Sequence, residues 1–294
     1  LEVKTRYLQV LQAREMVTLA QKSLESSQEH LRSSKKMLKV GLRSRTDVLR
    51  WEVQKANNEG NLVEAENNLK IAFGALQQIM GLSFEKKFGV NPLPFDPEPL
   101  TEGLEEQIKQ SSARHPGLRA FESSLNAQRA GVRLAWSAFQ PKVNFIYQLG
   151  WEQNNTLSLD SFSYWSAVLS VNIPLFHSFR NLASLQEAKA ELNRLQETQK
   201  DYEGLLTLEV IRARSDVESA FKRFHIAKKA VEQARENLRV LNNTYQVGLA
   251  ANIDVLDAEV VQTKAQAEFI NARYDYWIAR TQLDRALGVL RNSE

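Results

Sequence analysis

Proline is confined to the middle of this 294-residue chain, and its distribution limits the possible folds more than any other feature. All seven prolines lie between residues 92 and 174, so residues 1–91 and 175–294 contain none. Because proline breaks the interior of a helix, two long proline-free blocks around a punctuated centre predict two long helical regions.

Apolar residues in the second block recur at helical spacing. Between residues 177 and 247 they fall at intervals of three, four and seven among Glu, Lys, Arg and Gln, at Leu182, Leu185, Leu192, Leu195, Tyr202, Leu208, Val217, Phe221, Phe224, Val231, Leu238 and Leu241. Such sustained spacing is typical of coiled-coil packing. The alternative is a set of shorter helices broken by loops, for which Gly204 is the candidate break.

The chain matches itself without gaps at an offset of 207 residues. The clearest matches are Val40-Gly41-Leu42 with Val247-Gly248-Leu249, Asp47-Val48-Leu49 with Asp254-Val255-Leu256, and Gly81 with Gly288. In each copy a glycine and then polar residues separate two helical patterns, which predicts a long antiparallel helical hairpin. We expect the first hairpin at 1–82 with its tip at 40–47, and the second at 175–290 with its tip at 247–254.

The centre of the chain contains the strand signals. A Pro-rich connector at 83–100 leads to a helical region at 101–140, interrupted near His115-Pro116. Within 141–174, the runs Val143 to Leu149 and Trp165 to Ile173 alternate with period two around a polar loop at 152–163. Because a two-stranded hairpin is marginal alone, these strands must complete a sheet with other segments or other chains.

Composition argues against catalysis and nucleic-acid binding. The chain has no cysteine, and a net charge of +3 gives no electrostatic case for nucleic acid as the main partner. The four histidines are scattered, and no phosphate-binding or dinucleotide-binding motif occurs. We therefore expect no enzyme activity, no metal and no cofactor.

Five motifs give a specific resemblance. They are His115-Pro-Gly-Leu, Phe139-Gln-Pro141, Val171-Asn-Ile-Pro-Leu-Phe176, Tyr245-Gln-Val-Gly-Leu249 and Asp254-Val-Leu-Asp-Ala-Glu259. Together with the duplicated hairpin and the strand pair, they resemble the TolC-like outer membrane efflux protein family. The resemblance implies a mainly α fold of duplicated coiled-coil hairpins, with one β-hairpin that contributes to the outer-membrane β-barrel of a homotrimer. It also implies contact with outer-membrane lipid, and a tunnel that extends into the periplasm of a Gram-negative bacterium.

The repeat also predicts that the N-terminal part of the family fold is missing. The first copy has no counterpart of residues 83–207, a shortfall of 125 residues. We expect an earlier helix and a first strand pair to be absent from this chain.

The resemblance assigns a channel constriction to Asp254 and Asp257, which match family positions whose carboxylates ring the narrow periplasmic end. Residues three apart share a helix face, and two levels of carboxylates in a threefold constriction would favour cations. The alternative is local, because an acid at the N-cap and another at N3 stabilise a helix start. One residue can do both.

The resemblance further assigns a tip gate to Thr46, Asp47 and Tyr245, which match positions that bond neighbouring hairpins together. The arginine partner of the family would fall at Ala250, which is a departure. Arg43 and Arg45 could supply the charge instead, but we favour reading them as solvated turn residues.

The apolar tips are the expected contact with a periplasmic adaptor protein, which links the tunnel to an inner-membrane pump. They comprise Val40, Gly41, Leu42, Val247, Gly248 and Leu249. The alternative is that they cap the hairpins by packing on their own helices.

The sequence thus predicts a passive conduit, the outer-membrane component of a tripartite multidrug efflux or type I secretion system. The alternative is a periplasmic coiled-coil scaffold or adaptor without a channel. Substrate class stays open between drugs, metal ions and secreted proteins.

Overall fold

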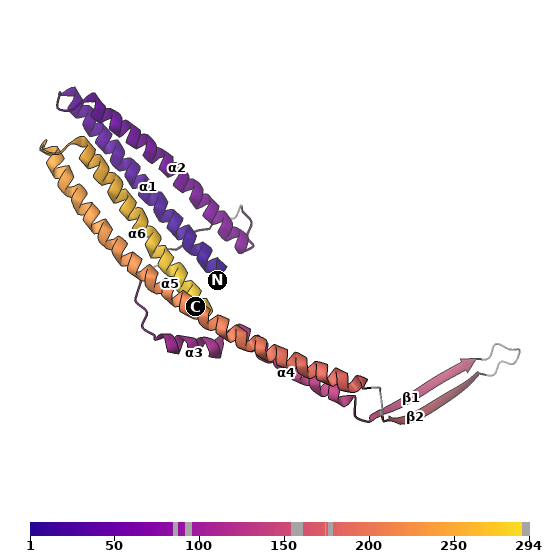
Figure 1. Cartoon of the computed structure of the whole chain (residues 1–294). Helices are drawn as coiled ribbons and strands as arrows, with labels where there is room; N and C mark the ends of the chain where they lie inside the picture. Colours follow the sequence, from indigo (N-terminus) through magenta and orange to yellow (C-terminus); the bar gives the residue numbers. More distant parts are fainter. Residues whose placement is uncertain (85–87, 92–95, 154–160, 174, 176–178, 290–294) are drawn as a thin grey trace. The chain divides into compact units, whose positions relative to one another are not determined.

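The fold is mainly helical. The computed structural model describes residues 1–84, 88–91, 96–153, 161–173, 175 and 179–289. In that part, six helices flank one strand pair: α1 (Glu2–Lys39), α2 (Arg45–Ile79), α3 (Leu104–Arg114), α4 (Pro116–Ser137), β1 (Lys142–Gln153), β2 (Ser161–Asn172), α5 (Arg180–Gln246) and α6 (Asn252–Ala286) (Figure 1). Contacts divide the chain into two compact units, Leu1–Arg114 with Leu206–Glu294, and His115–Leu205.

The internal repeat is visible in the helix boundaries. Helices α2 and α6 are each 35 residues long and begin at matching positions of the two copies, and α1 and α5 also end at matching positions. Four glycines with positive φ follow helix ends at corresponding positions: Gly41 and Gly248, and Gly81 and Gly288. The same backbone device therefore terminates the helices in both copies, because glycine adopts this conformation without steric cost.

Helix α5 continues through Gly204 for 67 residues. The alternative of several shorter helices is therefore wrong for this segment. A glycine inside a helix lowers helix stability by about 1 kcal/mol relative to alanine, and the strong helix-forming residues on either side of Gly204 offset this loss.

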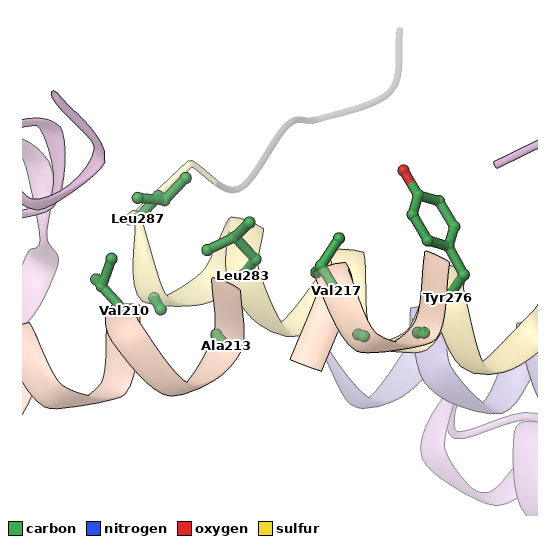
Figure 2. Close-up of a cluster of buried hydrophobic side chains, with 9 residues drawn as sticks. Val210, Ala213, Val217, Tyr276, Leu283 and Leu287 are labelled. Atoms are coloured by element: carbon green, nitrogen blue, oxygen red, sulfur yellow. The ribbon is translucent and has the colours of Figure 1, made fainter. Parts of the chain in front are cut away.

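The two largest apolar clusters of the first unit join its helices. In one, α5 packs on α6 through Val210, Ala213, Val217, Tyr276 and Leu283, with Leu287 beside them (Figure 2). In the other, Leu8, Val10 and Leu11 of α1 pack with Leu76 of α2 and with Ile270 and Tyr274 of α6. Helix α1 thus lies against both α2 and α6, as Figure 1 shows.

The second unit begins with the His115-Pro-Gly segment. The Nδ1 atom of His115 accepts the Gly117 N–H at 3.2 Å and caps α4, and Pro116 occupies the first turn. A Cβ atom at Gly117 would clash with the Tyr202 ring, so any other residue here would force that ring to move. The motif therefore serves the packing of α4 against the first part of α5.

Strands β1 and β2 pair antiparallel in continuous register from Lys142–Asn172 to Gln153–Ser161. The predicted loop at 152–163 is too long at both ends, because ladder pairing extends each strand beyond its alternating run; residues 154–160 lie outside the described residues. One face carries large apolar side chains, all more than half exposed: Val143, Phe145, Tyr147, Leu149, Trp151, Trp165, Leu169 and Val171.

None of the helices in the described part of the chain has a stretch apolar enough to span a membrane.

Candidate functional site

The two hairpin tips are built alike. At the end of α1, the Leu42 N–H donates to the Met37 carbonyl at 2.9 Å and the Gly41 N–H to Leu38 at 3.1 Å. At the end of α5, Leu249 donates to Thr244 at 2.9 Å and Gly248 to Tyr245 at 3.1 Å. This pattern of crossed bonds satisfies the last carbonyls of each helix and reverses the chain.

The apolar side chains of both tips point away from the helices. Val40 is 68% exposed, Leu42 73%, Val247 70% and Leu249 83%. The alternative that they pack on their own helices is therefore wrong. Exposed apolar groups in such a turn have no role in the core of this chain and are available to a partner.

Asp254 occupies a different cap position from the predicted one, and Asp47 occupies the matching position in the first tip. Ser44 is the N-cap of α2, and its Oγ accepts the Asp47 N–H at 3.2 Å while the Asp47 carboxylate accepts the Ser44 N–H at 3.1 Å. In the second copy Ala251 is the N-cap, and the Asp254 carboxylate accepts its N–H at 3.0 Å. Because alanine has no side-chain acceptor, only half of that capping box exists.

Asp254 is therefore the N3 residue of α6, not its N-cap, and Asp257 lies almost one turn further along the helix. Both side chains are exposed. The Asp254 carboxylate accepts a backbone N–H and is still exposed to solvent, so its role in the cap leaves the predicted constriction role open. Asp257 takes no part in the cap, so the capping interpretation fails for it.

The gate residues lie in three different environments. Thr46 is exposed, Asp47 is half-buried in the capping box, and Tyr245 is 6% exposed. The Tyr245 hydroxyl is buried and has no hydrogen-bond partner among the described residues. Within one chain these three side chains form no common hydrogen-bond network, so a gate made by them requires neighbouring hairpins.

Arg43 joins the two tips. Its Nη2 donates to the Tyr245 carbonyl at 3.1 Å, and its guanidinium carbon lies 4.0 Å from the centre of the Tyr245 ring. Reading Arg43 as a solvated turn residue is therefore wrong, because a cation over an aromatic ring with a carbonyl acceptor is a specific contact. Arg45 is exposed to solvent as predicted, but it is the first residue of α2 rather than part of the turn.

A buried polar link behind the tips was not anticipated from the sequence. Trp51 of α2 is fully buried and donates its indole N–H to the Asn252 side chain at 2.6 Å. Asn252 in turn donates to the Asp47 carbonyl at 3.3 Å. His30 of α1 stacks on Trp51 at 4.4 Å, and burial lowers its pKa. Helices α1, α2 and α6 therefore meet at one aromatic residue.

The position of Trp51 gave one usable signal. It is the only tryptophan in the first predicted hairpin, and it lies in the first turns after a predicted tip. Because an aromatic side chain gains much from burial, a lone tryptophan close to a predicted tip is a candidate for packing between helices.

A shallow cleft of about 320 Å³ opens beside this link. Its walls come from the starts of α2 and α6 and are mostly apolar, with Thr46, Leu49, Arg50, Val53, Gln54, Ile253 and Leu256. In the described residues no group of His, Asp and Glu side chains is arranged to hold a metal ion.

Comparison with known families explains this architecture. The family model described as "Outer membrane efflux protein" matches residues 1–82 and 107–289, which include both hairpins and the strand pair. The chain belongs to the outer membrane efflux protein family. The predicted resemblance and the mainly α fold class are therefore confirmed.

Relatives in this family extend over the whole chain. The outer membrane protein TolC of Vibrio cholerae is 24% identical over 100% of this chain and 68% of its own length. The alkaline protease secretion protein AprF of Pseudomonas aeruginosa is 22% identical over 98% of this chain and 61% of its own length. The chain thus spans about two thirds of the length of these relatives.

A solved structure has the same fold. The open state of the MtrE outer membrane channel from Neisseria gonorrhoeae superposes with a TM-score of 0.79 at 21% identity, covering 99% of this chain and 66% of that one. Membership of an outer membrane efflux family places the chain at the Gram-negative outer membrane and periplasm, as predicted. It also agrees with a transport role rather than an enzymatic one.

Proposed function

We propose that this chain forms the major part of a passive conduit, the outer-membrane component of a tripartite efflux or type I secretion system. Family membership supports the transport class, and its relatives include both a TolC protein and a protease secretion protein. The observation that carries the proposal is the pair of matched tips, which both have exposed apolar turns, together with the exposed acids Asp254 and Asp257 at the start of α6.

In the proposed assembly three copies surround a common axis. The apolar face of β1 and β2 has large exposed side chains, which a two-stranded sheet cannot bury by itself. Strands from other segments or protomers would extend this sheet, with the aromatic and aliphatic face against lipid. The exposed apolar face of β1 and β2 argues against a scaffold that has no membrane contact, because in such a scaffold the whole face would lie in water.

The constriction is proposed to consist of Asp254 and Asp257. Their side chains are three residues apart on α6 and both exposed, so threefold symmetry would place two levels of carboxylates near the axis. Such rings attract cations and repel anions. Arg43 and the Asp47 capping box would then hold the hairpin tips in place around them.

Single-channel recording of the full-length protein in planar bilayers tests the constriction. In the variant Asp254→Asn/Asp257→Asn, residue 254 keeps a side-chain oxygen that can accept the Ala251 N–H, so charge is removed while the cap is retained. We expect lower cation preference. Asp275→Asn, an exposed acid further along α6, is the matched control. Unchanged selectivity in the double variant would refute the assignment.

Adaptor contact is proposed for the apolar tips. The best variants are Val247→Ser and Leu249→Ser, because Gly248 has a φ of 79° and any side chain there adds backbone strain. We expect loss of adaptor-dependent efflux with normal oligomer yield. Val63→Ser is the control, since Val63 is 67% exposed on α2 but lies far along the sequence from both tips. Equal efflux in the tip and control variants would rule out this contact.

A further inference from the structure

Glu259 is a buried acid for which the tip geometry gives no role. It is 5% exposed, and no other Asp, Glu, Lys or Arg side chain in the described part of the chain is buried to this degree. Neither of its carboxylate oxygens has a hydrogen-bond partner among the described residues. An isolated ionised carboxylate in such a place costs several kcal/mol, far more than the neutral acid.

The walls around Glu259 are small and weakly polar. Ser26 of α1 lies next to the carboxyl group and lowers its pKa, which is a smaller influence than burial, although no hydrogen bond of normal geometry joins the two side chains. Ten residues along α6, Phe269 contacts Phe224 of α5, and Ala234 on the same helix α5 is buried. Four residues along α6, Thr263 bonds Ser23 of α1 at 3.2 Å.

The charged side chains at the height of Glu259 along the helices either face solvent or pair with one another. On α2, Lys55 is paired with Glu59 at 2.8 Å. On α1, His30 is stacked against Trp51. The remaining ionisable groups near this level are exposed: Lys22, Glu25 and Glu29 on α1, Asp257 and Lys264 on α6, and Glu232 and Arg235 on α5. Burial is therefore the main influence on the carboxyl group, and it raises the pKa of Glu259.

We propose that Glu259 is a proton-binding site in the interface between α1 and α6. The packed interface holds the carboxyl group in its neutral form. Loss of the proton to solvent favours a second arrangement, in which the first turns of α6 separate from α1 and water reaches the carboxylate. Because all walls of the site come from one chain, assembly with other copies leaves the burial in place. The proposal does not depend on the channel function.

The sign of the effect follows from the neutral form. The packed state keeps its full stability below the ordinary carboxyl pKa of 4.5 and loses it as the pH rises through the raised value in the packed state. Glu259 is seven residues from Asn252, whose bonds to Trp51 and Asp47 join the two hairpins. Separation of this part of α6 from α1 would therefore weaken the Asn252 bonds, and the two tips would be less firmly joined at higher pH.

Hydrogen–deuterium exchange of the full-length protein in detergent tests the proposal. Protection of the amides in 252–265 is compared between wild type and Glu259→Gln at pH 5 and pH 8, with 276–286 as the internal reference. Comparison at equal pH cancels the intrinsic pH dependence of exchange. Gln is neutral at both pH values, so we expect similar protection at pH 5. At pH 8 we expect wild type to exchange faster than the variant, so that the ratio of the wild-type rate to the variant rate rises between pH 5 and pH 8.

Two further variants keep the test decisive. Glu268→Gln removes an exposed acid from the same helix and should leave the wild-type pH response intact. If Glu259→Gln does not fold, Glu259→Met provides a neutral side chain of similar length for the same measurement. The proposal is overturned if wild type and the neutral variant respond equally to pH, or if Glu268→Gln abolishes the response as well.

Discussion

Replacing Trp51 by Phe should destabilise the junction of α1, α2 and α6 by about 2–4 kcal/mol. The indole N–H donates to the Asn252 side-chain oxygen at 2.6 Å in a site where Trp51 is fully buried and Asn252 is 3% exposed. Phe can keep the stack on His30 but has no donor, so the Asn252 oxygen loses its partner without access to water.

Two contributions make up this magnitude. An unsatisfied buried acceptor costs about 1–3 kcal/mol. The smaller ring also leaves a void, which costs on the order of 1 kcal/mol here, because complete truncation of a buried aromatic side chain to alanine costs about 3–5 kcal/mol.

Guanidinium unfolding followed by far-UV circular dichroism measures this loss. Trp136→Phe is the matched control, because Trp136 is 54% exposed and its replacement should change stability by less than about 0.5 kcal/mol. A double-mutant cycle with Asn252→Ala should show coupling of about 1 kcal/mol or more. The reasoning is refuted if Trp51→Phe matches the control, or if the two substitutions are additive.

Three more predictions use the repeat, a buried phenol and the arginine at the tips. Ser44→Ala should lower the free energy of unfolding by about 1 kcal/mol, whereas Ala251→Ser, which completes the second capping box with Asp254, should raise it by up to about 1 kcal/mol. Guanidinium unfolding that gives the two variants effects of equal sign would contradict this. Burial and the Glu15 contact raise the pKa of Tyr274 to about 12, so the free energy of unfolding should fall between pH 10 and pH 12. This fall should be smaller in Tyr274→Phe, and identical pH profiles of the two proteins would argue against the prediction. Arg43→Ala should lower the free energy of unfolding by about 1–2 kcal/mol, because it removes the contact with Tyr245, and Arg45→Ala should lower it by less than about 0.5 kcal/mol. Thermal unfolding that ranks the two variants in the opposite order would disprove the contact.

The architecture was largely predictable because it depends on local and periodic signals. Proline cannot lie inside a long helix, glycine ends a helix at positive φ, and alternation marks a strand with two different faces. The internal repeat carried the most information, since it located Gly41 and Gly248 at matching turns, and the structure places both there.

Cap positions were less predictable because neighbouring polar residues compete for the same role. Ser44, Thr46 and Asp47 are all good N-cap residues in isolation, and so is Asp254. The structure selects Ser44 and Ala251, since the helix start is fixed by the glycine turn three residues earlier in each copy. The strand ends differ for a similar reason, because ladder pairing between β1 and β2 continues beyond the alternating residues.

By itself, then, the sequence determined the duplicated hairpins, the tips and the strand pair, since each depends on residues close together in the chain. The tertiary structure alone decided the surroundings of Arg43, Trp51 and Glu259. Those surroundings are formed by helices that lie far from each of these residues in the sequence. Whether an arginine is solvated or stacked, and whether a carboxyl group is charged or neutral, depends on which helix covers it.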